Sequence, residues 1–75
     1  MKKIRIYLKS IIDAKNFCDR VKNFDFDIEL VSGKSTANAK DVMDVLTLDL
    51  SEDVTVIAHT ANAQILEEQI KEFIV

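Results

Sequence analysis

The chain has 75 residues, of which 48% are hydrophobic, and this length and apolar content predict a single domain, residues 1–75, that folds around one core. The net charge of −3, with no run of more than two basic residues, argues against a nucleic-acid partner. No apolar stretch approaches the roughly 20 residues that span a membrane, and the charged N-terminus does not resemble a secretory signal.

The first predicted element is a strand over residues 2–8. Its side chains alternate, with Ile4, Ile6 and Leu8 on one face and Lys3, Arg5 and Tyr7 on the other. This period of two is typical of a strand that is buried on one face only.

A helix is predicted to begin at Ser10. Ser10 and Asp13 have the spacing of a capping box, in which the serine oxygen accepts a hydrogen bond from the N–H three residues later. The apolar stripe of this helix is formed by Ala14, Phe17, Cys18 and Val21. Because Cys18 is the only cysteine, no internal disulfide can form, and we expect a small core residue in a reducing, cytoplasmic setting.

A second strand is predicted over residues 24–31, where apolar and acidic residues alternate. The residues expected to point inward are Phe24, Phe26, Ile28 and Leu30. Ser32 and Gly33 predict a hairpin turn, since glycine adopts a positive φ at little cost. A short third strand is expected over residues 34–39.

Asp41 is predicted to start a short second helix, and a fourth strand is expected over residues 53–59. Asn62 is predicted to cap the last helix. The buried stripe of that helix is expected to contain Leu66, Ile70, Phe73 and Ile74, with Ala63 and Ile65 beside it.

The predicted order is therefore βαββαβα. Two split βαβ units joined through a hairpin predict an α+β open-faced β-sandwich, a four-stranded antiparallel sheet with three helices on one face.

The run FDFDIELVSGKSTANAKDVMDVLTLDLSEDVTVIAHTANA, residues 24–63, resembles HPr, the small histidine-containing phosphocarrier of the sugar phosphotransferase system. The matching features are the DIEL strand, the GK turn, the helix that begins KDVM and the DVTV strand. Length and element order agree over essentially the whole chain. The resemblance implies the open-faced β-sandwich that the pattern of residues predicts independently.

The chain departs from HPr proteins where their chemistry lies. Those proteins place H-A-R-P-A between the first strand and the first helix, and an ungapped alignment puts residues 10–14, SIIDA, there. Ser10 therefore stands at the position of the phospho-histidine, and Ile12 at that of the arginine. A serine without a general base is a weak nucleophile whose phosphate ester is too stable to pass on, so we expect no phosphate relay. The only histidine, His59, falls in the predicted fourth strand and is expected to be a surface residue.

Asp41 stands where some HPr proteins carry a regulatory serine. A helix N-cap explains this aspartate by itself. A permanent, partial imitation of phosphoserine is the alternative, and both can hold at once.

The starts of the first two helices form the partner-docking surface of the HPr fold, which implies protein contacts here through Ile11, Ile12, Val42, Met43 and Leu46. An exposed apolar cluster often marks an interaction site. The alternative is that Val42 and Leu46 pack into the core, whereas Ile11 and Ile12 are not easily buried together.

The favoured hypothesis is a non-catalytic, regulatory or protein-interaction module related to the phosphotransferase system, binding protein partners of that system. A phosphocarrier and a ligand-binding or assembly domain that shares only the fold are the alternatives. No enzyme activity, cofactor or metal site is predicted, and the sequence does not specify an oligomeric state.

Overall fold

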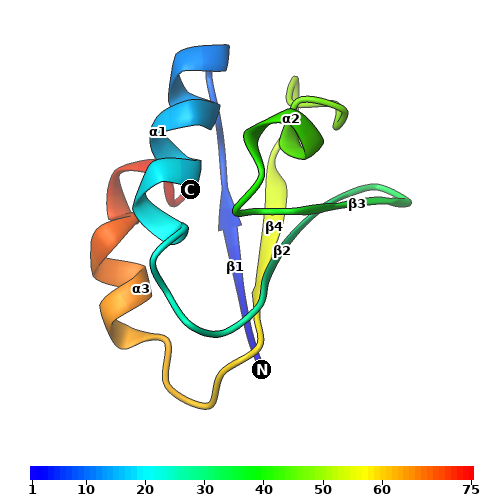
Figure 1. The fold of residues 1–75 in the computed structure, drawn as a ribbon. Helices are drawn as coiled ribbons and strands as arrows, with labels where there is room; N and C mark the ends of the chain where they lie inside the picture. Colours follow the sequence, from blue (N-terminus) through cyan, green and yellow to red (C-terminus); the bar gives the residue numbers. More distant parts are fainter.

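The computed structural model describes all residues, 1–75, and contains the predicted elements in the predicted order (Figure 1). The elements are β1 (Lys2–Ile6), α1 (Ile11–Val21), β2 (Ile28–Ser32), β3 (Ser35–Asn38), α2 (Val42–Val45), β4 (Val54–Ala58), α3 (Gln64–Gln69) and a 3₁₀ turn, η1 (Lys71–Phe73). None of these helices is long and apolar enough to cross a membrane.

The four strands form one antiparallel sheet in the order β1-β4-β2-β3. Lys2 lies opposite Ala58 and Ile6 lies opposite Val54, so β1 and β4 are paired along their whole length. Figure 1 shows α1 and α3 next to each other along one face of the sheet, and α2 lies by the end of β3 in contact with α1. The α+β open-faced β-sandwich predicted from the sequence is thereby confirmed.

The core lies between the sheet and the helices and contains only apolar side chains. The inward-facing residues predicted for β1 and for α1, Cys18 among them, are all buried. The rings of Phe17 and Phe73 meet edge to face, with 5.8 Å between their centroids. No polar or charged residue is buried.

The prediction of a strand over residues 24–31 is wrong for its first half, because β2 begins only at Ile28. Its neighbour β4 ends at Ala58, opposite Ile28, so residues 24–27 have no strand beside them. Phe24 and Phe26 are consequently half-buried at the edge of the core, with their rings 5.3 Å apart. Their alternation reflects partial burial rather than strand pairing.

The end of β1 also differs from the prediction, which extended that strand to residue 8. The strand stops at Ile6 because β4 begins at Val54 and offers no partner beyond it. The C-terminal segment pairs with this end of β1 on the edge opposite β4: the backbone N–H of Tyr7 donates to the oxygen of Phe73 at 2.8 Å, and the N–H of Val75 donates to the oxygen of Arg5 at 3.2 Å. Ile74 forms a bridge with Ile6 in between.

The last helix is shorter than its apolar pattern suggested. It begins at Gln64 with Ala63 as its N-cap, one residue after the predicted Asn62, although the Oδ1 atom of Asn62 accepts from the N–H of Gln64 at 3.1 Å. Leu66, Ile70, Phe73 and Ala63 are buried as predicted. Ile74 was wrongly placed in the buried stripe, because the helix gives way to a 3₁₀ turn and then to the bridge with β1. Ile65, which was predicted beside the stripe, is exposed on α3.

Candidate functional site

Ser10 is the N-cap of α1 and is engaged in local hydrogen bonds. Its backbone is extended, with φ −156° and ψ 171°, and its Oγ accepts from the N–H of Asp13 at 3.2 Å. In return, the Oδ2 atom of Asp13 accepts from the N–H of Lys9 at 3.1 Å. The capping contact predicted for Ser10 and Asp13 is confirmed, and it assigns the Ser10 hydroxyl a structural role.

His59 lies at the opposite end of the sheet from Ser10. It follows Ala58, which pairs with Lys2 at the start of β1, whereas Ser10 comes after Ile6 at the other end of that strand. The four residue-to-residue steps from Lys2 to Ile6 separate these ends by about 13 Å. Since His59 is the only histidine, no imidazole is available to activate the Ser10 hydroxyl.

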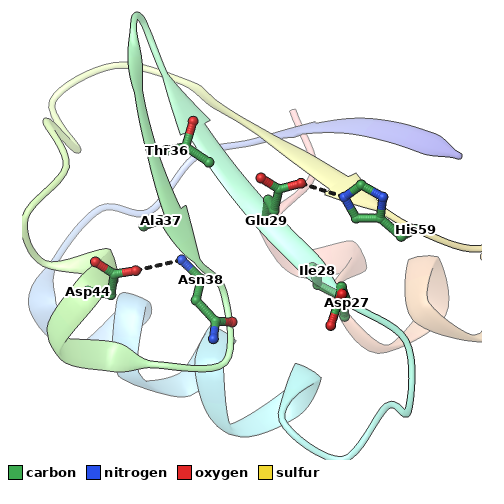
Figure 2. A pocket seen from close by; sticks show the side chains of 8 residues that line it. All are labelled: Asp27, Ile28, Glu29, Thr36, Ala37, Asn38, Asp44 and His59. Carbon is green, nitrogen blue, oxygen red and sulfur yellow. Dashed lines mark hydrogen bonds and ion pairs between the residues drawn. The ribbon is translucent and has the colours of Figure 1, made fainter.

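His59 is exposed, just beyond the end of β4 rather than within it as predicted. Its Nε2 atom pairs with Oε1 of Glu29 on β2 (Figure 2). Its backbone N–H donates to the oxygen of Asp27 at 2.9 Å, which extends the contact between β4 and the chain leading into β2. No group of three or more His, Cys, Asp and Glu side chains is placed to hold a metal ion.

Asp41 caps α2, as one of the two interpretations of the sequence requires. Its Oδ1 accepts from the N–H of Met43 at 3.1 Å and from the N–H of Asp44 at 3.4 Å. These contacts satisfy two N–H groups that a helix start otherwise leaves unpaired. Whether Asp41 also imitates a phosphorylated serine stays a prediction.

Asp44 makes a contact that the sequence did not reveal. Its Oδ2 accepts from the backbone N–H of Asn38 at 2.8 Å, which joins α2 to the outer edge of β3 (Figure 2). The only local signal was an acidic residue in the first turn of the helix, which is common for reasons of the helix dipole alone. The partner on β3 could be identified only from the folded structure.

The apolar residues at the starts of α1 and α2 divide into two groups. Ile11, Ile12 and Met43 are 69%, 71% and 72% exposed, and we call these three residues the docking face. Val42 and Leu46 are half-buried and pack against the core. The alternative prediction, that these two residues pack into the core, is therefore correct in part. Contacts between α1 and α2 bring the two helices of the docking face together. Its binding to a partner stays a prediction.

Cys18 is buried in the stripe of α1. Burial, with smaller contributions from the charges of Asp19 and Asp41, raises the pKa of the Cys18 thiol to about 11. At neutral pH the sulfur therefore stays protonated, and the thiolate, which is the reactive form, is scarce.

An aromatic disulfide reagent at pH 7.5 is accordingly expected to leave Cys18 unmodified in the native protein. Modification should become rapid only in denaturant, with a rate that follows the fraction of unfolded chain. The absorbance of the released thiol measures this, and rapid reaction of the folded protein would contradict the buried placement.

Two surface hollows are present. The larger, of about 500 Å³, is lined by Asp27, Ile28, Glu29, Thr36, Ala37, Asn38, Asp44 and His59 (Figure 2). The smaller, of about 260 Å³, is lined by Arg20, Asn23, Phe24, Ile65 and Gln69. Neither contains Ser10 or the docking face.

Comparisons with known proteins agree with this architecture. Residues 13–75 match the family described as PTS HPr component phosphorylation site. The match begins just after Ser10, Ile11 and Ile12. The crystal structure of HPr-C-His from Thermoanaerobacter tengcongensis has a TM-score of 0.80 and 21% sequence identity, over 99% of this chain and 91% of that chain. At this identity the likeness concerns the fold, and no curated protein shows a significant match.

Proposed function

This chain belongs to the HPr family, and from that premise we propose that it is a regulatory or protein-interaction module related to the phosphoenolpyruvate-dependent sugar phosphotransferase system, one that neither carries phosphate nor catalyses a reaction. The observation that carries the proposal is that Ser10, which the ungapped alignment with HPr proteins puts at the phospho-histidine position, serves as a helix cap. A phosphocarrier is the alternative function, and a fold-only ligand-binding or assembly domain is the third.

The chemistry of phosphate transfer supports a non-carrier role. A carrier needs a nucleophile that is neutral near pH 7 and that forms a phosphorylated species reactive enough to pass its phosphoryl group on, as imidazole does. The Ser10 hydroxyl has no histidine beside it to act as a general base, because the single histidine lies at the other end of the sheet. Ile12 offers no charged donor to a phosphate, whereas the guanidinium of an arginine at this position would bind two oxygens of the phosphate.

The docking face supports a role in protein contacts. Ile11, Ile12 and Met43 expose most of their side chains, and a cluster of exposed apolar residues on a small surface favours association with another protein. The partners we propose are phosphotransferase-system or regulatory proteins. The family relation and the single free cysteine support a cytoplasmic setting for these contacts.

We propose that Asp41 affects such contacts by permanently imitating a phosphorylated serine. Phosphoserine carries about −1.5 to −2 charges and three acceptor oxygens. A carboxylate whose Oδ1 already accepts from two backbone N–H groups supplies only part of this. Replacing Asp41 with serine keeps a capping oxygen and removes the charge, so a change in partner binding by Asp41→Ser is the signature of mimicry.

The test of the non-carrier role is a phosphorylation assay. The protein is incubated with labelled phosphoenolpyruvate and Enzyme I of the phosphotransferase system, and an HPr protein that has its histidine serves as the positive control. We expect label on the control and none on this chain. Acid-labile label on this chain, which is the signature of a phosphoramidate, would establish the carrier alternative.

A further inference from the structure

The face of the sheet opposite α1 and α3 is covered by no other element (Figure 1). Its side chains alternate along each strand with the buried ones. Directly paired residues point to the same side of a sheet, so the pairing of the strands arranges these side chains in rows that cross the sheet. We call the surface formed by two such rows the open face: Lys3, Ile57, Glu29 and Asn38, and beside them Arg5, Thr55, Val31 and Thr36.

The two sides of the open face carry opposite charges. On β1, Lys3 and Arg5 are exposed and neither takes part in an ion pair. On the side of β2 and β3 lies the hollow of about 500 Å³, and three carboxylates line it, those of Asp27, Glu29 and Asp44 (Figure 2). The open face is therefore basic on β1 and acidic over β2 and β3.

The strand between these two sides is β4, because the strand order is β1-β4-β2-β3. Ile57 on β4 is half-buried and lies directly between Lys3 and Glu29 in its row. Oε1 of Glu29 already pairs with His59, which leaves Oε2 for a further cation. An apolar side chain thus lies at equal distances, about 4.8 Å by the spacing of strands, from a basic strand and an acidic one.

We propose that the open face binds a second copy of this chain, so that the protein forms a weak symmetric dimer in which two sheets pack face to face. A two-fold axis parallel to β4 carries β1 of each copy over β2 of the other. Lys3 of one copy then lies against Glu29 of the second copy, and the reverse pair forms at the same time. Ile57 meets Ile57 of the second copy at the axis. The proposal is independent of the proposed function, because the docking face lies on the helices.

Charge complementarity selects both the occupant and its orientation. The cations that would neutralise the acidic hollow are presented by the same face of the same chain, one strand to the other side of β4. A two-fold axis that runs across the strands would instead place β1 over β1 and set basic side chains against each other, which costs binding energy. The axis parallel to the strands is therefore the one that pairs unlike charges.

The dimer is expected to be weak. The open face measures about 19 Å across its four strands and about 17 Å along five residues of a strand, which places it at the low end of protein interfaces. Ion pairs that stay near solvent contribute little, and salt screens them. We expect a dissociation constant on the order of 100 µM that increases with ionic strength.

Exchange of charge between Lys3 and Glu29 provides a matched set of variants. Lys3→Glu sets two carboxylates against each other at both contacts of the dimer, and Glu29→Lys sets two ammonium groups against each other. The double variant with Lys3→Glu and Glu29→Lys restores unlike pairs and keeps the net charge of the wild type. Lys15→Glu is the control, because Lys15 is exposed on α1, away from the open face, and its replacement changes the net charge as Lys3→Glu does.

The experiment is sedimentation velocity of each protein between about 10 µM and about 1 mM, a range that brackets the expected constant, at low and at high salt. We expect the mass of the wild type to rise above the 8.5 kDa of one chain. Amide shifts of the ¹⁵N-labelled protein are expected to change with concentration in β1, β4 and β2. Each single variant should associate at least about tenfold more weakly, whereas the double variant and Lys15→Glu should associate as the wild type does.

Three results would overturn the proposal: a wild type that stays monomeric at about 1 mM, equal weakening by Lys3→Glu and Lys15→Glu, or concentration-dependent shifts on the docking face instead of the open face. A monomeric wild type whose Glu29 amide shifts on addition of tetralysine would assign the hollow to a basic segment of another protein. The dispersed amide spectrum shows that each variant is folded. Association of the double variant shows that neither substitution prevents folding.

Discussion

Phe17→Ala is expected to lower the free energy of unfolding by about 3–5 kcal/mol, the usual cost of truncating a buried phenylalanine. Phe17 is fully buried in α1 and meets the ring of Phe73 edge to face. The guanidinium of Arg20 lies over the Phe73 ring, 5.1 Å from its centroid, and Arg20 also forms an ion pair with Glu72. Loss of Phe17 therefore removes the buried contact between α1 and the C-terminal segment and leaves only the partly exposed contacts of Arg20.

Urea denaturation followed by far-ultraviolet circular dichroism measures this effect. A domain of 75 residues has little stability to spare, so a substantial part of the variant is expected to be unfolded at 37 °C. Phe26→Ala is the control, because Phe26 is the same residue type but only half-buried at the edge of the core. Equal destabilisation by the two substitutions would contradict the packing described for Phe17.

Ile12→Arg is expected to weaken binding of the protein partner at least about tenfold, which corresponds to the energy of one central apolar contact at an interface. The arginine places a charge on the docking face, where the partner is expected to present apolar surface. Since Ile12 is 71% exposed, the substitution is expected to leave stability unchanged.

Affinity capture from the native cell extract, with mass spectrometry of the retained proteins, identifies the partner, and titration of that partner measures the loss. Ile65→Arg is the matched control, because Ile65 is 68% exposed on α3 and outside the docking face. Undiminished binding of the same partner by Ile12→Arg would exclude this face as the contact. An equal loss with Ile65→Arg would show that added charge alone is responsible.

Local sequence was sufficient to predict the structural features that depend on residues close together in the chain. The Ser10–Asp13 contact, the stripe that buries Cys18 and the turn at Gly33, which has a φ of 59°, all form within a few residues. The order of the elements followed from the alternation of apolar residues, and the resemblance to HPr pointed to the same sheet. Each of these signals is carried by spacing along the chain.

The errors concern contacts between distant parts of the chain. Phe24 and Phe26 alternate like strand residues, but β4 stops before it reaches them. Ile74 has helical spacing, but its backbone pairs with Ile6 at the edge of β1. The bond from Asn38 to Asp44 likewise depends on where α2 lies against β3. Periodicity reports which side chains are buried, and it does not report which backbone segment lies beside them.

The two margins of the sheet limit how other chains can join it. An unpaired strand edge is a template on which a foreign strand can be added, in recognition or in aggregation. Here the carboxyl end of β1 is paired with the C-terminal residues, its amino end carries Lys2 and Lys3, and Asp44 occupies an outward N–H of β3. These contacts and charges hinder the addition of a foreign strand at the carboxyl end of β1, at its amino end and at Asn38 of β3, and so oppose the merging of neighbouring copies into a continuous sheet.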